Sequence, residues 1–128
     1  MNTPEGTKLI KGEIADYYIE DGILISLSKS CVRTVENITA NVALVKQITQ
    51  NKKMPLLIYL TNSPVPDKAT RKLSTEKLPE IYTAMAMIAK PGLASLIMGI
   101  LFKLKPPPIP MKQFTDETQA KQWLQQFN

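Results

Sequence analysis

The sequence predicts a single α/β domain built on a mixed, mostly parallel five-stranded sheet with helices packed on it. Short apolar runs typical of strands alternate with longer amphipathic runs typical of helices. A hairpin signal precedes them, so the expected order of elements is β-β-α-β-α-β-α-β-α. With 128 residues, of which 44% are hydrophobic, the chain is long enough for one core. We expect a flexible lead-in over residues 1–10 and one domain over residues 11–128.

The first two strands are predicted at residues 13–19 and 23–27. Both runs are rich in β-branched and aromatic residues, and Asp21-Gly22 lies in the turn between them. Glycine accepts the positive φ that tight hairpin turns require. A helix follows that Thr34 can cap, and its apolar residues recur at helical spacing: Ile38, Val42, Val45 and Ile48.

Residues 55–60 (PLLIYL) form a nearly continuous apolar run, which is typical of a central parallel strand buried on both faces. The proline-rich loop at residues 61–67 follows at the carboxyl end of that strand, where ligands usually sit in open α/β sheets. Asp67 can cap a second helix that runs from Lys68 to about Leu78 and that the next residue, a proline, helps to close.

Residues 83–89 (TAMAMIA) are ambiguous, because alanine and methionine favour helix. We interpret this run as a strand, since a helix here would leave no strand between two helices. A hydrophobic helix is predicted over residues 93–104. A short strand at residues 111–114 follows a run of prolines, which suits a sheet edge. Thr115 can cap the last helix, whose docking face contains Ala120, Trp123, Leu124 and Phe127.

Composition excludes several classes of function. The chain has no histidine and a single cysteine, Cys31, so most zinc sites and all nucleophile–histidine pairs are excluded. We expect no enzyme activity, cofactor or metal. The net charge of +5 is dispersed, and no aromatic residues interleave with the basic pairs, so we expect no nucleic-acid binding. The lone cysteine and the absence of a signal-like segment favour the cytoplasm.

Three segments resemble the STAS domain superfamily, and in particular its SpoIIAA-like branch of small bacterial proteins, which is related in fold to the CRAL-TRIO lipid-binding domain. They are the hairpin at residues 13–27, the strand, helix and proline-rich return at residues 83–110, and the tail at residues 112–124 (KQFTDETQAKQWL). The resemblance covers about residues 11–127. It implies the same element order and a regulatory role.

The resemblance also implies a phosphorylatable serine after the strand that matches residues 55–60. This chain has Thr61-Asn62-Ser63-Pro64 there and lacks the glycine of the family pattern. Ser63, Thr61 and Thr70 are therefore the candidate phosphorylation sites, because a helix N-terminus stabilises a phosphate. Alternatively, Ser63 makes a local hydrogen bond within the turn.

The hydrophobic helix at residues 93–104 suggests how the protein acts. A helix on a sheet buries only part of its circumference, so apolar surface should remain for a partner. Our first hypothesis is a non-enzymatic regulatory module that acts through protein contacts, as a homodimer or with another protein. The rival hypothesis is a carrier or sensor of a lipid, a membrane surface or a hydrophobic small ligand. The residues expected at either contact are Leu96, Ile97, Ile100, Leu101 and Phe102.

Overall fold

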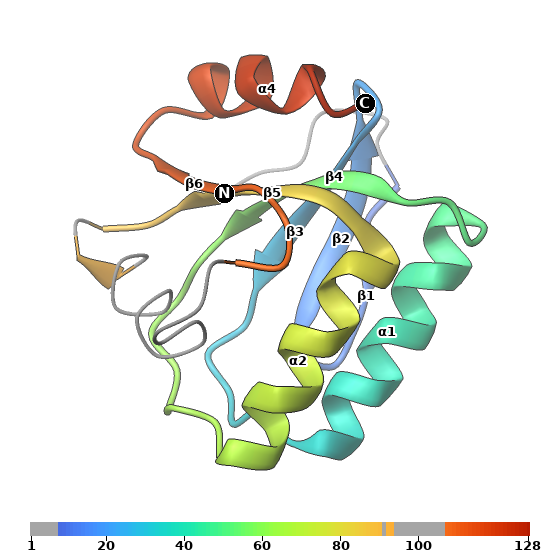
Figure 1. The fold of residues 1–128 in the computed structure, drawn as a ribbon, viewed down its shortest axis with the longest axis vertical. Coiled ribbons are helices and arrows are strands. Elements are labelled where there is room, and N and C mark those ends of the chain that lie inside the picture. The colour runs from blue at the N-terminus through green and yellow to red at the C-terminus, as the bar shows by residue number, and fades with distance from the viewer. Residues whose placement is uncertain (1–7, 91, 94–106) are drawn as a thin grey trace.

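The computed structural model describes residues 8–90, 92–93 and 107–128. Within these ranges six strands form one sheet, and three helices pack against it (Figure 1). The predicted α/β class and mixed sheet are confirmed, but the described sheet has six strands, and five were predicted. In chain order the elements are β1 (Ile10–Lys11), β2 (Ala15–Glu20), β3 (Ile23–Ser28), α1 (Val35–Thr49), β4 (Met54–Tyr59), α2 (Lys68–Ile81), β5 (Tyr82–Ile88), β6 (Met111–Phe114) and α4 (Glu117–Gln125).

The strands lie side by side in chain order, from β1 to β6. The first three pair antiparallel, whereas β3, β4, β5 and β6 pair parallel. Asp21 and Gly22 form the predicted hairpin turn with φ of 56° and 76°, the left-handed backbone that a type I′ turn needs. β6 is at the edge of the sheet, in agreement with the prolines before it.

Helices cover both faces of the sheet (Figure 1). On the face covered by α1 and α2, Val45 and Leu56 belong to one buried cluster. On the face covered by α4, Leu57 and Leu124 belong to a second. Neighbouring residues of β4 thus point into opposite layers, because side chains alternate along a strand. This arrangement confirms a central strand buried on both faces.

β5 confirms the strand predicted at residues 83–89. It lies between β4 and β6 and pairs with both in parallel. Met85 and Met87 belong to the cluster under α1 and α2, whereas Ala84 and Ala86 belong to the cluster under α4. The large side chains therefore fill one layer, and the small ones leave room for α4 in the other.

The helix caps agree with the sequence in two cases and differ in one. Thr34 caps α1 and forms a reciprocal capping box with Asn37. Asp67 caps α2, as predicted. The prediction that Thr115 caps the last helix is wrong, because Asp116 is the N-cap and its carboxylate accepts a backbone N–H of the first turn.

The predicted end of the second helix is also wrong. α2 continues through Pro79 and ends at Ile81, and Tyr82 begins β5 directly. Ile81 and Tyr82 are only 6% and 5% exposed, so the extra turn buries both side chains in the core. Proline fixes a φ that a helix tolerates, and tertiary burial outweighs the one hydrogen bond that proline cannot make.

Two further predictions concern the flexible lead-in and the hydrophobic helix. Ile10, which was predicted to end the flexible lead-in, begins strand β1. The hydrophobic helix predicted over residues 93–104 lies, from residue 94 onward, outside the described residues. In the ranges that the structure describes, no helix is long and apolar enough to cross a membrane.

Candidate functional site

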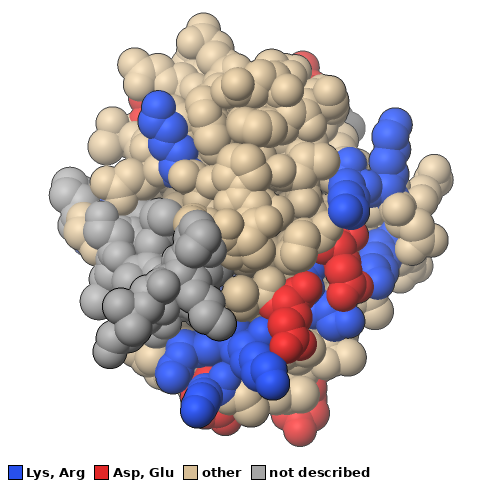
Figure 2. All heavy atoms as spheres, viewed as in Figure 1, with Lys and Arg blue, Asp and Glu red and all other residues tan. Residues whose placement is uncertain are grey.

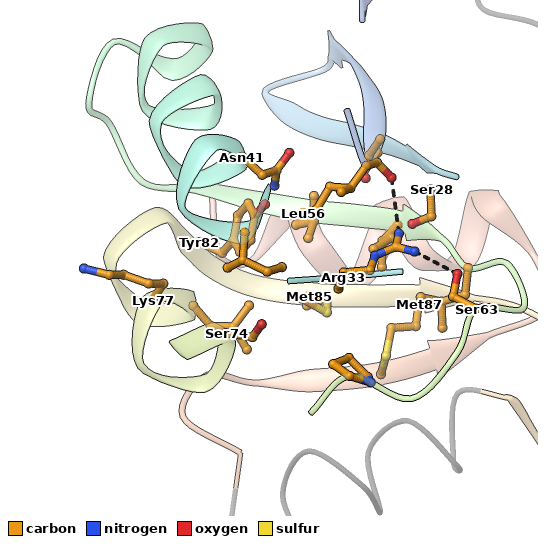
Figure 3. Close-up of a pocket in the computed structure, with 18 of the residues that line it drawn as sticks. Ser28, Arg33, Asn41, Leu56, Ser63, Ser74, Lys77, Tyr82, Met85 and Met87 are labelled. Carbon is orange, nitrogen blue, oxygen red and sulfur yellow. Dashed lines mark hydrogen bonds between the residues drawn. The ribbon is translucent and has the colours of Figure 1, made fainter. Parts of the chain in front are cut away.

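A cavity of about 270 Å³ lies between the sheet and the helices α1 and α2 (Figure 3). Its walls come from both helices, from the inner faces of β3, β4 and β5, and from the loop over residues 60–66 that follows β4. The cavity therefore reaches the carboxyl ends of parallel strands, where the sequence predicted a ligand site. The apolar side chains among those that line it are Ile14, Ala15, Ile38, Val42, Leu56, Ile58, Leu60, Pro64, Val65, Pro66, Leu78, Ile81, Met85, Met87, Leu93 and Met111.

Arg33 supplies a positive charge at one end of this cavity. It lies in the loop between β3 and α1, and its Nη1 donates hydrogen bonds to Ser63 Oγ at 2.7 Å and to the carbonyl oxygens of Lys29 and Cys31 at 2.8 and 3.0 Å. Nη2 donates to the carbonyl oxygen of Ile14 at 3.2 Å. These bonds hold the guanidinium in place between the hairpin and the loop after β4 (Figure 3).

The other end of the cavity is polar but neutral. The Tyr17 hydroxyl donates a hydrogen bond to Asn41 Oδ1 at 2.9 Å, and Tyr82 lies beside them (Figure 3). Burial raises the pKa of Tyr17 more than its hydrogen bond to Asn41 lowers it. Burial also raises the pKa of Tyr82 well above its usual value, and Tyr17 adds to the shift. Both phenols therefore stay protonated and uncharged at neutral pH.

Ser63 joins two loops and makes no local turn hydrogen bond in the described structure. Its Oγ accepts the Cys31 N–H at 3.3 Å in addition to the Arg33 bond, and it donates to the Lys29 carbonyl oxygen at 3.4 Å. These partners lie 30 to 34 residues away in the chain. The hydroxyl thus fastens the loop after β4 to the loop before α1.

The hydroxyl groups of the other two candidate phosphorylation sites are buried, although Thr61 as a whole is only half-buried. Thr61 lines the cavity with Ser63, and no described residue accepts or donates a hydrogen bond at its Oγ1. Thr70 is fully buried inside α2, and its Oγ1 also has no partner among the described residues. The structure thus brings Thr61 and Ser63 together and keeps Thr70 apart. Phosphorylation at any of the three stays a prediction.

The apolar residues expected at a ligand or partner contact, Leu96, Ile97, Ile100, Leu101 and Phe102, lie outside the described residues. The sequence interpretation missed the role of Arg33 at the cavity. The available signal was a cation in a strand-to-helix loop with no acidic residue beside it. That signal is weak, because the partners of Arg33 come from residues distant in sequence.

The opposite face of the sheet carries a charged group that fixes α4. Lys121 forms ion pairs with Glu20 of the hairpin and, at 3.4 Å, with Glu117 one turn earlier on the same helix. Burial raises the pKa of the nearby Tyr59, and Glu117 raises it further. Trp123 packs against two phenylalanine rings, with centroids 5.7 and 4.9 Å away. These contacts attach α4 to the sheet.

Comparison with solved structures shows the fold. The chain is similar to an uncharacterised protein of the DUF3478 family with a SpoIIAA-like fold from Shewanella loihica PV-4. The TM-score is 0.54 at 17% sequence identity, and the match covers 97% of this chain and 98% of that one. The chain therefore has the SpoIIAA-like fold that the sequence resemblance implied. A search of curated proteins gave no match.

A family model shows the family as well. It matches residues 17–128, from the middle of β2 to the last residue of the chain. This range includes the whole parallel part of the sheet, α1, α2 and α4. The chain belongs to the DUF7793 family of domains of unknown function.

Proposed function

We propose that the protein is a non-enzymatic binding module that takes up a small, largely apolar molecule in the cavity between the sheet and α1 and α2. The observation that carries this proposal is the cavity itself, about 270 Å³ in volume and walled mostly by aliphatic and methionine side chains. Ligand sites are typically concave and apolar, with a few polar groups that orient the ligand. The tyrosine–asparagine pair and Arg33 are such groups here.

The size of the cavity limits its ligand. An apolar cavity of about 150 Å³ holds one benzene molecule. In proportion, a cavity of about 270 Å³ accommodates roughly ten non-hydrogen atoms. A medium-length alkyl chain or a substituted aromatic ring has this size. A full membrane lipid is much larger, so at most part of one acyl chain would enter.

The chemistry around Ser63 supports binding without catalysis. A serine nucleophile needs a neighbouring base that removes its proton. The groups that contact Ser63 Oγ at 2.7 and 3.3 Å are the Arg33 guanidinium and the Cys31 N–H. Both are donors, and a guanidinium does not deprotonate in a protein. Ser63 Oγ itself donates to the Lys29 carbonyl oxygen at 3.4 Å, which is not a base, so none of these contacts removes the hydroxyl proton.

Titration with 1-octanol tests the proposal in protein labelled at its methionine methyl groups. We expect saturable NMR shifts at Met85 and Met87, which line the cavity. Met54 is the internal control, because it packs on the same core but does not line the cavity. Shifts that stay linear with octanol concentration up to its solubility limit, or that are equal at Met54, would contradict the proposal.

The first hypothesis, action through protein contacts as a homodimer, stays a prediction. The exposed valines near the start of α1 and in the loop after β4 support it: Val32, Val35 and Val65, at 59, 40 and 58% exposure. Light scattering at high protein concentration should give about twice the monomer mass of 14.3 kDa. A mass of one chain across the whole concentration range would contradict a homodimer.

A further inference from the structure

We propose that the molecule bound in the cavity is an amphiphile with a single carboxylate head, and that this carboxylate pairs with Arg33. The inference rests on the proposed function, because it names the chemical class of the ligand of that same cavity. Three features support it: the charge around Arg33, the hydrogen-bond donors that Arg33 has left, and the surroundings of its guanidinium.

The cavity contains an unbalanced positive charge. Its described lining includes two cations, Arg33 and Lys77, and no aspartate or glutamate. Lys77 pairs with Glu80 at 3.2 Å and points away from the cavity (Figure 3). No described carboxylate lies within ion-pair distance of Arg33; the nearby Asp16 pairs with Lys29 at 3.2 Å. A partly buried cation is most stable beside an anion, so the ligand is the missing partner.

Arg33 also has donors left for a ligand. A guanidinium has five N–H groups. Both N–H groups of Nη1 and one of Nη2 are used by the hydrogen bonds described above, all to oxygen atoms of the protein. The Nε–H and the second Nη2–H have no acceptor among the described residues. Nε and Nη2 share one edge of the guanidinium, and two N–H groups on one edge match the two oxygens of a carboxylate.

The surroundings favour a head with one negative charge. Three backbone carbonyl oxygens, those of Ile14, Lys29 and Cys31, already contact the guanidinium. Their partial negative charges would repel a doubly charged phosphate monoester more than a carboxylate. Beyond Arg33 the walls are apolar and the far end is neutral, which suits an uncharged tail.

The surface charge agrees with an anionic ligand. Figure 2 shows Lys and Arg side chains gathered where α2 begins, at the lower end of the face in view. Lys68, Arg71 and Lys72 lie in the first turns of α2, directly after the loop that lines the cavity. Such a patch attracts anions toward the cavity and raises their rate of association.

Calorimetric titration of the unmodified protein with four ligands of equal tail length tests the proposal at neutral pH. The ligands are octanoate, octylamine and octyl phosphate, each below its micelle concentration, and 1-octanol below its solubility limit. We expect octanoate to bind at least about tenfold more tightly than 1-octanol, and octylamine to bind most weakly. Octanol that binds as tightly as octanoate would overturn the carboxylate pairing and leave the proposed function standing. Octyl phosphate that binds more tightly than octanoate would overturn the single-charge head. If none of the four binds, the proposed function itself fails.

Two substitutions of Arg33 then locate the carboxylate. Arg33→Gln should lower octanoate affinity to that of 1-octanol, and Arg33→Lys should recover only part of it, since lysine keeps the charge but loses the paired donors. Lys52→Gln is the control, because it also removes one positive charge, but from an exposed residue that does not line the cavity. An unchanged octanoate preference in folded Arg33→Gln overturns the proposal. If that variant does not fold, the comparison of the four ligands on the unmodified protein tests the proposal by itself.

Discussion

Replacing Leu57 by alanine should lower the free energy of unfolding by about 2–5 kcal/mol, as truncations of fully buried leucines do. Leu57 is 0% exposed at the centre of β4, and in the sheet it lies between Ile25 of β3 and Ala86 of β5. Its side chain belongs to the cluster under α4. Neither α4 nor the rigid sheet can close the space that the truncation leaves. Urea unfolding followed by circular dichroism measures the change.

Ile19→Ala is the matched control, because Ile19 is also a strand residue but is 44% exposed. We expect Ile19→Ala to lower the free energy of unfolding by less than about 1 kcal/mol, because the truncation removes little buried apolar area. A loss below about 1 kcal/mol for Leu57→Ala, or equal losses for the two variants, would mean that the layer under α4 is not packed as described. Leu57 does not line the cavity, so its truncation should leave ligand affinity unchanged in the folded protein.

Replacing Val42 by phenylalanine should weaken binding of 1-octanol at least about tenfold, or by at least about 1.4 kcal/mol. Val42 is 9% exposed on the inner face of α1 and lines the cavity. An aromatic ring there occupies much of the space that the ligand would fill. The NMR titration of the methionine methyl groups gives the dissociation constant.

Ala43→Phe is the control for Val42→Phe. It places the same ring on the next residue of α1, which faces the solvent. We expect wild-type affinity for this variant, because the added ring does not reach the cavity. Circular dichroism establishes that both variants are folded. Wild-type affinity in folded Val42→Phe would show that octanol binds elsewhere, and the proposed function would then be wrong.

Much of the fold could be predicted because its signals are local. The apolar run before the proline-rich loop, the Asp21-Gly22 turn and the caps Thr34 and Asp67 each depend on a few neighbouring residues. Prediction of strand β5 required an additional argument, because its alanines and methionines favour helix. There the requirement for a strand between two helices outweighed local propensity.

Two of the errors have long-range causes. β1 is only two residues long, and it forms because Ile10 and Lys11 pair with Tyr17 and Asp16 of β2. Two residues are too few for a periodic pattern, so the sequence does not predict such a strand. α2 passes Pro79 because burial of the residues that follow stabilises the extra turn.

The sequence indicated part of the surroundings of the cavity but not its chemistry. The sequence indicated the loop after β4, and the cavity opens beside that loop. The charge at the cavity depends on Arg33 meeting Ser63, which is 30 residues away, and on three carbonyl oxygens that no motif records. Contacts of this kind exist only once the hairpin and the two loops have come together.

The direct junction of α2 and β5 makes the spacing between them intolerant of insertions. One additional residue after Ile81 would shift β5 by a single position against its neighbours, and every side chain of the strand would then turn to the other layer. The methionines would collide with α4, and alanines would replace them as the cavity wall. Relatives that change length are therefore expected to do so in the loop after β4 rather than at this junction.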